Sequence, residues 1–272
     1  MRVWLPSART CGDWFKETNC SGPERPEVDY HAGLAILTTY LPPARHAERP
    51  GRGYFFPGTM SRAEPAVKRA VVFIDGQNLF HAAREAFGYT YPSYDVKALA
   101  ERLCAAPGWQ LAQTRFYTGI PDVADNAFWH SFWERKLRVI SWQGVHVYSR
   151  SLRYRNKTVR LPDGTEYTFL AGEEKGIDVR IALDVIRMAH RNEFDVALVL
   201  SQDQDLSEVA AEIRIIAREQ NRWIKIACAF PSSPTSRNRR GIDKTDWVRI
   251  DRATYDARLD RRDYRRPDAS GT

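Results

Sequence analysis

Two short runs of consecutive apolar residues stand out along the chain. Ala70–Ile74 is followed by Asp75, and Val196–Leu200 is followed by Ser201. Uninterrupted apolar, β-branched runs of this length are typical of strands buried on both faces of a parallel sheet. The flanking patterns predict helices over 78–87, 95–106, 124–142, 177–190 and 206–221, and further strands over 114–118, 145–149 and 224–230.

The stretch Ser151–Leu170 has a different pattern, with alternating residues on either side of Pro162-Asp163-Gly164. This arrangement predicts a β-hairpin. Elsewhere strands and helices alternate, so we predict an α/β fold with a mostly parallel central sheet, helices on both faces and an inserted hairpin. Functional sites in such folds lie at the carboxyl ends of the strands.

The two ends of the chain differ from this central region. Eight of the 15 prolines fall in the first 65 residues, so we predict an irregular extension over 1–65 and a folded domain over 66–250. Met60 precedes the domain directly, and we hypothesise that translation starts there. Residues 251–272 are expected to form a basic, partly helical tail, because Arg258, Arg261 and Arg265 recur at helical spacing.

Composition narrows the class of protein. The 272 residues include 41 Lys and Arg against 34 Asp and Glu, a net charge of +7 that suits a polyanionic partner. No apolar run reaches the roughly 20 residues of a membrane span, so no membrane association is expected. The four cysteines lack the spacing of a zinc site or a disulfide framework, which favours a cytoplasmic protein.

Acidic residues follow the predicted strands. Asp75 ends the first buried strand, Asp203 and Asp205 follow the second, and Asp178 lies where a loop turns into a helix. If the segment after the second strand stays extended, Ser201 and both aspartates point to one side. Gathered carboxylates repel one another, and Mg²⁺ or Mn²⁺ would remove that cost. For each aspartate, the alternative is a helix N-cap.

Two neighbouring residues have open roles. Asp184 lies six residues after Asp178, about 240° around the predicted helix. It either supports the metal site from behind or pairs with Arg180 or Arg187. Lys175 either reaches a scissile phosphate or is an exposed loop lysine.

Three motifs in this order resemble one known family. Phe73-Ile-Asp-Gly-Gln-Asn-Leu79, Glu174-Lys-Gly-Ile-Asp-Val179 and Leu198-Val-Leu-Ser-Gln-Asp-Gln-Asp-Leu206 resemble the NYN domain in its LabA-like (DUF88) branch. These domains are relatives of PIN-domain ribonucleases. The resemblance extends from about Lys68 to Ile250, and three ordered motifs are far more specific than any one alone.

The resemblance implies a PIN-like three-layer sandwich with a metal-dependent ribonuclease site that uses Mg²⁺ or Mn²⁺. Asn78 and Ser201 would be polar supports of that site. The catalytic, metal-holding residues that it implies are Asp75, Asp178, Asp203 and Asp205.

The last motif departs from the family pattern, which usually reads Ser-Gly-Asp-Ser-Asp. Here Gln202 and Gln204 replace the glycine and the second serine. If that glycine has a positive φ, Gln202 would be strained. The acids are kept, which favours a working site.

Two basic groups are candidate contacts for RNA. One lies on a single face of the predicted hairpin, and the other lies in the loop after the last predicted strand; the alternative for both is a solvated surface. They are Arg153, Arg155 and Lys157 on the hairpin, and Arg237, Arg239 and Arg240 in the loop.

The sequence therefore predicts a Mg²⁺- or Mn²⁺-dependent ribonuclease. A non-catalytic RNA-binding or regulatory module of the same fold is the alternative. A haloacid-dehalogenase-like phosphatase would need a second aspartate two residues after Asp75, where the chain has Gln77. The aromatic stretch Phe128–Trp133 either belongs to the core or packs against a second subunit in a homo-oligomer.

Overall fold

The computed structural model describes residues 62–160 and 165–265. Most of the predicted extension, the hypothetical start at Met60, the hairpin turn at Pro162–Gly164 and the last residues of the tail lie outside this part of the chain.

The central sheet has six strands, all parallel, which confirms the predicted α/β class. Their order is β3-β2-β1-β6-β7-β8. The chain therefore adds β2 and β3 on one side of β1, and then adds β6, β7 and β8 on the other side. The carboxyl ends of β1 and β6 therefore flank the switch point, where open α/β sheets form their sites. The strands are β1 (Arg69–Asp75), β2 (Gln110–Ile120), β3 (His146–Ser151), β6 (Val196–Leu200), β7 (Lys225–Pro231) and β8 (Asp246–Ile250).

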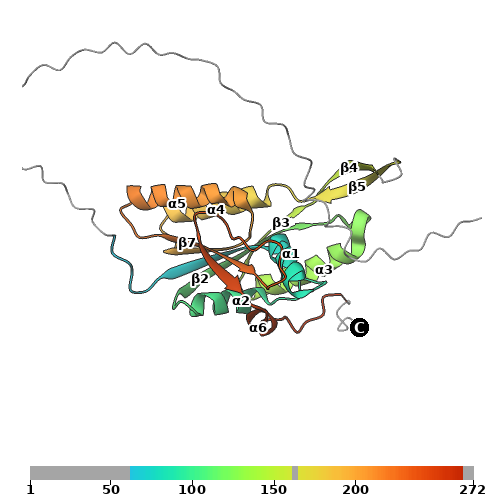
Figure 1. The fold of residues 1–272 in the computed structure, drawn as a ribbon. Helices are drawn as coiled ribbons and strands as arrows, with labels where there is room; N and C mark the ends of the chain where they lie inside the picture. The colour runs from blue at the N-terminus through green and yellow to red at the C-terminus, as the bar shows by residue number, and fades with distance from the viewer. Residues whose placement is uncertain (1–61, 161–164, 266–272) are drawn as a thin grey trace, which may run out of the picture. The chain divides into compact units, whose positions relative to one another are not determined.

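Helices cover both faces of the sheet (Figure 1). Val71 and Phe73 of β1 pack with Ile181 and Ile213 under α4 and α5, and the alternate residues of β1 face the other helices. This explains the uninterrupted apolar run of β1. The helices are α1 (Gly76–Phe87), α2 (Val96–Ala105), α3 (Val123–Trp142), α4 (Ile177–His190), α5 (Ser207–Glu219) and α6 (Arg252–Asp256), with a 3₁₀ turn, η2 (Gln204–Leu206), before α5.

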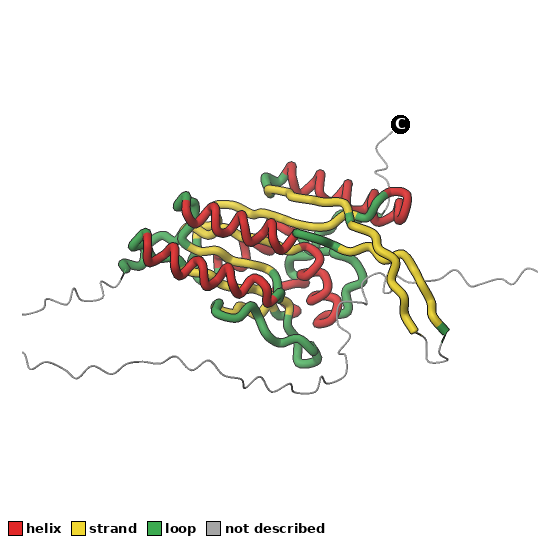
Figure 2. The backbone as a smooth tube through the Cα atoms, turned by 90° about the horizontal axis from the view of Figure 1, so that it is seen from above, coloured by secondary structure: helices red, strands yellow, loops and turns green. Residues whose placement is uncertain are grey.

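The predicted hairpin is confirmed. β4 (Arg153–Arg160) and β5 (Glu166–Glu173) pair antiparallel as a separate two-stranded sheet. It projects from the body of the domain (Figure 2). The aromatic stretch of α3 supplies core residues: Phe132 and Trp133 are buried, and the Trp133 ring lies 6.0 Å from that of Phe116.

The C-terminal segment corrects the prediction of a helical basic stripe. Helix α6 ends at Asp256, and the described arginines beyond it, Arg258, Arg261, Arg262 and Arg265, lie on an irregular segment. Backbone hydrogen bonds fix this segment against the start of α2, where the N–H of Asp260 donates to the carbonyl of Ser93 and that of Asp95 to the carbonyl of Arg258. These contacts outweigh the local helical preference.

Candidate functional site

The end of β1 places a buried carboxylate at the switch point. Asp75 is 8 % exposed, and its Oδ1 accepts a hydrogen bond from the backbone N–H of Asn78 (3.0 Å), which caps α1. Asp75 is therefore the N-cap of α1, as the alternative for this residue predicted. Because a carboxylate has about four lone-pair sites, capping leaves acceptor capacity for a cation.

The segment after β6 forms the opposite side of the switch point. The backbone N–H of Asp203 donates to Ser201 Oγ (3.1 Å), and Asp203 Oδ1 accepts from the N–H of Asp205 (3.0 Å). Asn78 Oδ1 accepts from the N–H of Gln202 (2.9 Å) and thereby ties α1 to this segment. Ser201 and Asn78 thus position the two aspartate-bearing elements.

One acid of the site, Glu174, was not predicted from the sequence. Its Oε2 accepts a hydrogen bond from the backbone N–H of Gly119, at the end of β2 (2.9 Å). A Cβ at Gly119 would lie 2.8 Å from this oxygen and 3.1 Å from Gln77 Nε2. The glycine therefore opens the space that Glu174 occupies. The signal in the sequence was the acidic pair Glu173-Glu174.

Four carboxylates interact here, and we call Asp75, Glu174, Asp178 and Asp203 the acidic site. Burial raises the pKa of Asp75, and the charges of Asp203 and Asp178 raise it further. The pKa of Glu174 is likewise raised, first by burial and then by the charges of Asp75 and Asp178. Within the described residues, none of the four forms an ion pair. The described part of the chain therefore gathers four carboxyl groups in a confined space without a basic partner.

Asp178 and Asp205 differ in their placement. Asp178 lies in the first turn of α4, after a Gly176 of positive φ (76°). Asp205 was expected to share one side with Asp203, but the chain leaves the extended conformation at Gln204 and forms η2, and Asp205 is exposed. The expected alignment is wrong because capping by Asp203 turns the backbone.

The carboxylate of Asp184 is held by a cluster of tyrosine and arginine side chains. Its buried carboxylate accepts hydrogen bonds from Tyr117 Oη (2.9 Å) and Arg115 Nη2 (3.0 Å), and it also pairs with Arg180 and Arg187. The ion-pair alternative is therefore confirmed. Lys175 is exposed, and its Nζ lies 3.9 Å from Glu173 Oε2.

The donor set fits a hard divalent cation. Oxygen ligands from carboxylates are those that Mg²⁺ and Mn²⁺ prefer, and the glycine-lined space at Gly119 admits Glu174. Among the described residues, no three acidic, histidine or cysteine side chains already converge as ligands of one ion. Repulsion separates like charges, so a bound cation would have to draw these oxygens together.

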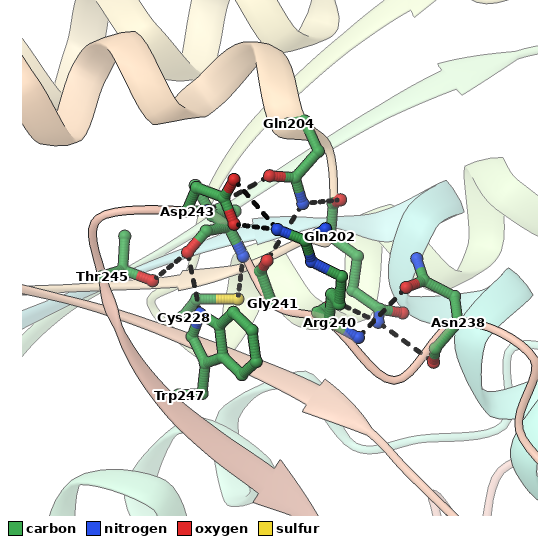
Figure 3. A network of polar contacts seen from close by, with 10 residues as sticks. Gln202, Gln204, Cys228, Asn238, Arg240, Gly241, Asp243, Thr245 and Trp247 are labelled. Carbon is green, nitrogen blue, oxygen red and sulfur yellow. Dashed lines mark hydrogen bonds and ion pairs between the residues drawn. The ribbon is translucent and has the colours of Figure 1, made fainter.

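The two glutamines of this segment are accommodated without strain. The non-glycine residues of positive φ in the described chain are Asn192, Asn221 and Lys244, so Gln202 has an ordinary φ. The strain expected for Gln202 is therefore wrong. Instead, Gln202 Nε2 donates to the carbonyl of Arg240 (2.7 Å), as Figure 3 shows.

The basic face of the hairpin is partly neutralised. Glu173 lies 3.4 Å from Lys157 Nζ and 3.9 Å from Arg155 Nε. Arg153 pairs with Glu173 in the strand register and is exposed. The three basic residues therefore lie on one face of the hairpin, together with Glu173, which would compete with an anionic ligand for them.

The second basic group lies on a loop between β7 and β8. We call Ser236–Asp243 the basic loop. Arg239 folds back onto the carbonyls of Ser236 and Pro234, and Arg240 pairs with Asp243 (3.0 Å). The guanidinium of Arg237 is exposed and makes no hydrogen bond or ion pair with a described residue.

Comparison with known proteins adds a family. The model of the NYN domain matches residues 69–236. A search of curated proteins gives no match. Among solved structures, a Vibrio parahaemolyticus protein of unknown function is 18% identical, with a TM-score of 0.41, over 70% of this chain and 97% of its own. MurG of Acinetobacter baumannii is 10% identical, with a TM-score of 0.27, over 67% of this chain and 45% of its own.

In the described part of the chain, no helix is long and apolar enough to cross a membrane. The matched region begins at Arg69, the first residue of β1, and contains the whole acidic site. This chain belongs to the NYN domain family, within the PIN-like nuclease superfamily.

Proposed function

We propose that this protein is a Mg²⁺- or Mn²⁺-dependent ribonuclease of the LabA-like branch, with its catalytic domain over residues 66–250 and a cytoplasmic location. One observation carries the proposal: four carboxylates that form no ion pair with a described residue gather at the switch point of an NYN domain. Burying unpaired carboxylates costs free energy, which a bound cation recovers.

The acidic residues would hold the metal ion. The ligands would be the four residues of the acidic site, Asp75, Glu174, Asp178 and Asp203. We also propose Asp205 as an outer ligand. When bound, the ion activates water and offsets charge on the reacting phosphate.

Support for this arrangement comes from neighbouring polar groups. Asn78 and Ser201 keep the two aspartate-bearing segments in register through their hydrogen bonds. Lys175 and the basic residues of the hairpin and basic loop would bind the RNA backbone.

A cleavage assay tests the proposal. The full chain with Mn²⁺ is expected to cut single-stranded RNA, and Asp75→Asn/Asp203→Asn is expected to lose at least 100-fold in rate, consistent with the scale of metal catalysis. Asp246→Asn is the control, since Asp246, the first residue of edge strand β8, pairs with Lys225, the first residue of β7 (2.6 Å). Equal cleavage by all three proteins would indicate a contaminating nuclease and contradict the proposal.

The non-catalytic RNA-binding module remains the second candidate. It is favoured by the basic surfaces rather than by the acidic site. RNA binding by the wild type with no cleavage, across single-stranded and structured RNA and both metals, would select it.

A further inference from the structure

The basic loop is fixed by two glutamine side chains. Gln202 Nε2 donates to the carbonyl of Arg240 (2.7 Å) and lies 3.4 Å from that of Asn238. Gln204 uses both ends of its amide: Nε2 donates to the carbonyl of Gly241 (2.9 Å), and Oε1 accepts from the N–H of Asp243 (3.2 Å) (Figure 3). These bonds satisfy backbone groups that a surface loop normally leaves to water.

Further contacts attach the same loop to the elements that carry the acidic site. Glu85 of α1 accepts from the backbone N–H groups of Arg237 and Asn238. The thiol of Cys228 donates to the carbonyl of Ser201 (3.0 Å), and its Sγ accepts from the N–H of Ile242 (3.4 Å). The loop is therefore joined to α1 and to the segment after β6.

Close packing also restricts the loop. A Cβ at Gly241 would lie 2.7 Å from Trp247 Cδ1 and 2.9 Å from Phe230 Cε1. Trp247 Nε1 donates to the carbonyl of Ile242 (2.8 Å). The backbone at 241–242 thus rests directly on the end of the sheet.

Among contacts with described residues, this framework leaves one of the loop's three arginines, Arg237, with its guanidinium unpaired. Arg239 and Arg240 are engaged within the loop, whereas Arg237 has its backbone fixed by Glu85 and its guanidinium exposed. An exposed guanidinium on a fixed backbone suits a phosphate of a nucleic acid strand.

We propose that Gln202 and Gln204 are positioning residues for RNA: they hold the basic loop in one conformation, so that Arg237 meets a backbone phosphate of the strand bound at the acidic site. A loop that is already ordered loses less conformational entropy on binding. The inference rests on the proposed function in taking RNA as the ligand and the acidic site as the place where the strand binds.

The test compares two Gln→Met substitutions, each of which removes one side-chain amide. Gln204→Met removes the amide from the exposed Gln204 and keeps its size, whereas Gln220→Met removes an amide that donates to the carbonyl of His190 (3.1 Å), beyond the end of α5. Binding of a fluorescein-labelled single-stranded RNA is measured by anisotropy with the full chain, in EDTA so that the RNA stays intact. Gln204→Met is expected to raise the Kd by about threefold to tenfold, and Gln220→Met to leave it unchanged.

A double-mutant cycle separates positioning from general stability. Arg237→Ala is expected to weaken binding in the wild-type background and to cost less in the Gln204→Met background. Trypsin is expected to cut the loop faster in Gln204→Met than in Gln220→Met. An unchanged Kd for Gln204→Met, or effects that simply add, would overturn the inference, even if the loop is cut faster.

Two safeguards keep the outcomes distinct. If Gln204→Met does not fold, Gln204→Glu replaces it, because it removes the amide donor at nearly constant size. Wild-type protein that binds RNA and cleaves none with Mn²⁺ defeats the nuclease proposal and leaves this inference standing. If the wild type cleaves RNA, and the wild type and Gln204→Met bind RNA with equal affinity, this inference alone is overturned.

Discussion

Glu174 reaches the acidic site because Gly119 has no side chain. The register of the hairpin pairs Arg153 with Glu173, which places Glu173 on the basic face and directs the next residue away from it. The sequence shows two adjacent glutamates without showing which one turns inward, since that depends on strand pairing. Asp75 ends β1 and Asp203 follows β6 by three residues. Both positions could be predicted from the sequence, because an acid at the end of a buried parallel strand lies at the carboxyl end of the sheet.

The first prediction concerns this glycine. Gly119→Ala would place a Cβ 2.5 Å from Leu152 Cδ2 and 2.8 Å from Glu174 Oε2, so we expect about 1–3 kcal/mol of destabilisation and weaker Mn²⁺ binding. Isothermal calorimetry and urea denaturation measure the two effects. In Gly119→Ala/Leu152→Ala the stability should recover in part and the Mn²⁺ affinity should not. Full recovery of both would show that Glu174 is not displaced.

The second prediction concerns Asp184. Burial alone would raise the pKa of Asp184, but the hydrogen bond from Tyr117 and the charges of Arg115 and Arg180 lower it below its usual value. Because the folded-state pKa is depressed, the stabilisation is complete above the unfolded pKa of about 3.9 and is lost as pH falls through the lower folded value. Asp184→Asn should therefore cost roughly 3 kcal/mol at pH 7 and progressively less below pH 4.

Urea denaturation of wild type and Asp184→Asn at several pH values checks this. An equal difference between the two proteins at pH 7 and pH 3 would contradict the assignment of Asp184 as a charged, paired carboxylate.

At the scale of elements, apolar periodicity predicted the buried strands and helices and missed elements that carry no continuous apolar pattern. Strand β8 carries an alternating Asp-Trp-Val-Arg-Ile sequence and is largely exposed, so it lacked the continuous apolar signal of β1. The turn η2 arises from a cap that Asp203 supplies. The arginines after α6 have helical spacing, yet contacts of Tyr264 with Arg135 fix the segment as irregular chain.

The hairpin gives the third prediction. Glu173 competes with RNA phosphates for Arg155 and Lys157, so Glu173→Gln should lower the Kd for single-stranded RNA and steepen the dependence of log K on log salt by about 0.7 for each further phosphate that the protein neutralises. Glu166→Gln, at the other end of β5, is the control. Anisotropy titrations in a salt series measure both quantities. A slope that is unchanged in Glu173→Gln would show that the hairpin face does not contact phosphates.

At the scale of the molecule, charge is separated by sign. The net charge of +7 conceals an acidic site at the switch point, with basic residues on the hairpin and the basic loop. Such an arrangement attracts a polyanion to the basic surfaces and a cation to the acidic site. The sequence predicted both groups, but the anchoring of the loop by Gln202 and Gln204 required the folded structure, because those residues meet it across about 36 positions of chain.

The central claim is that the acidic site binds a divalent cation, and direct Mn²⁺ binding tests it without any choice of RNA. Electron paramagnetic resonance of free Mn²⁺ is recorded during titration of the full-length wild type, Asp75→Asn/Asp203→Asn and Asp246→Asn. The account predicts saturable binding to the wild type and Asp246→Asn, with at least a tenfold weaker affinity in the double variant. Equal affinity in all three proteins, or no saturable binding to the wild type, would contradict it.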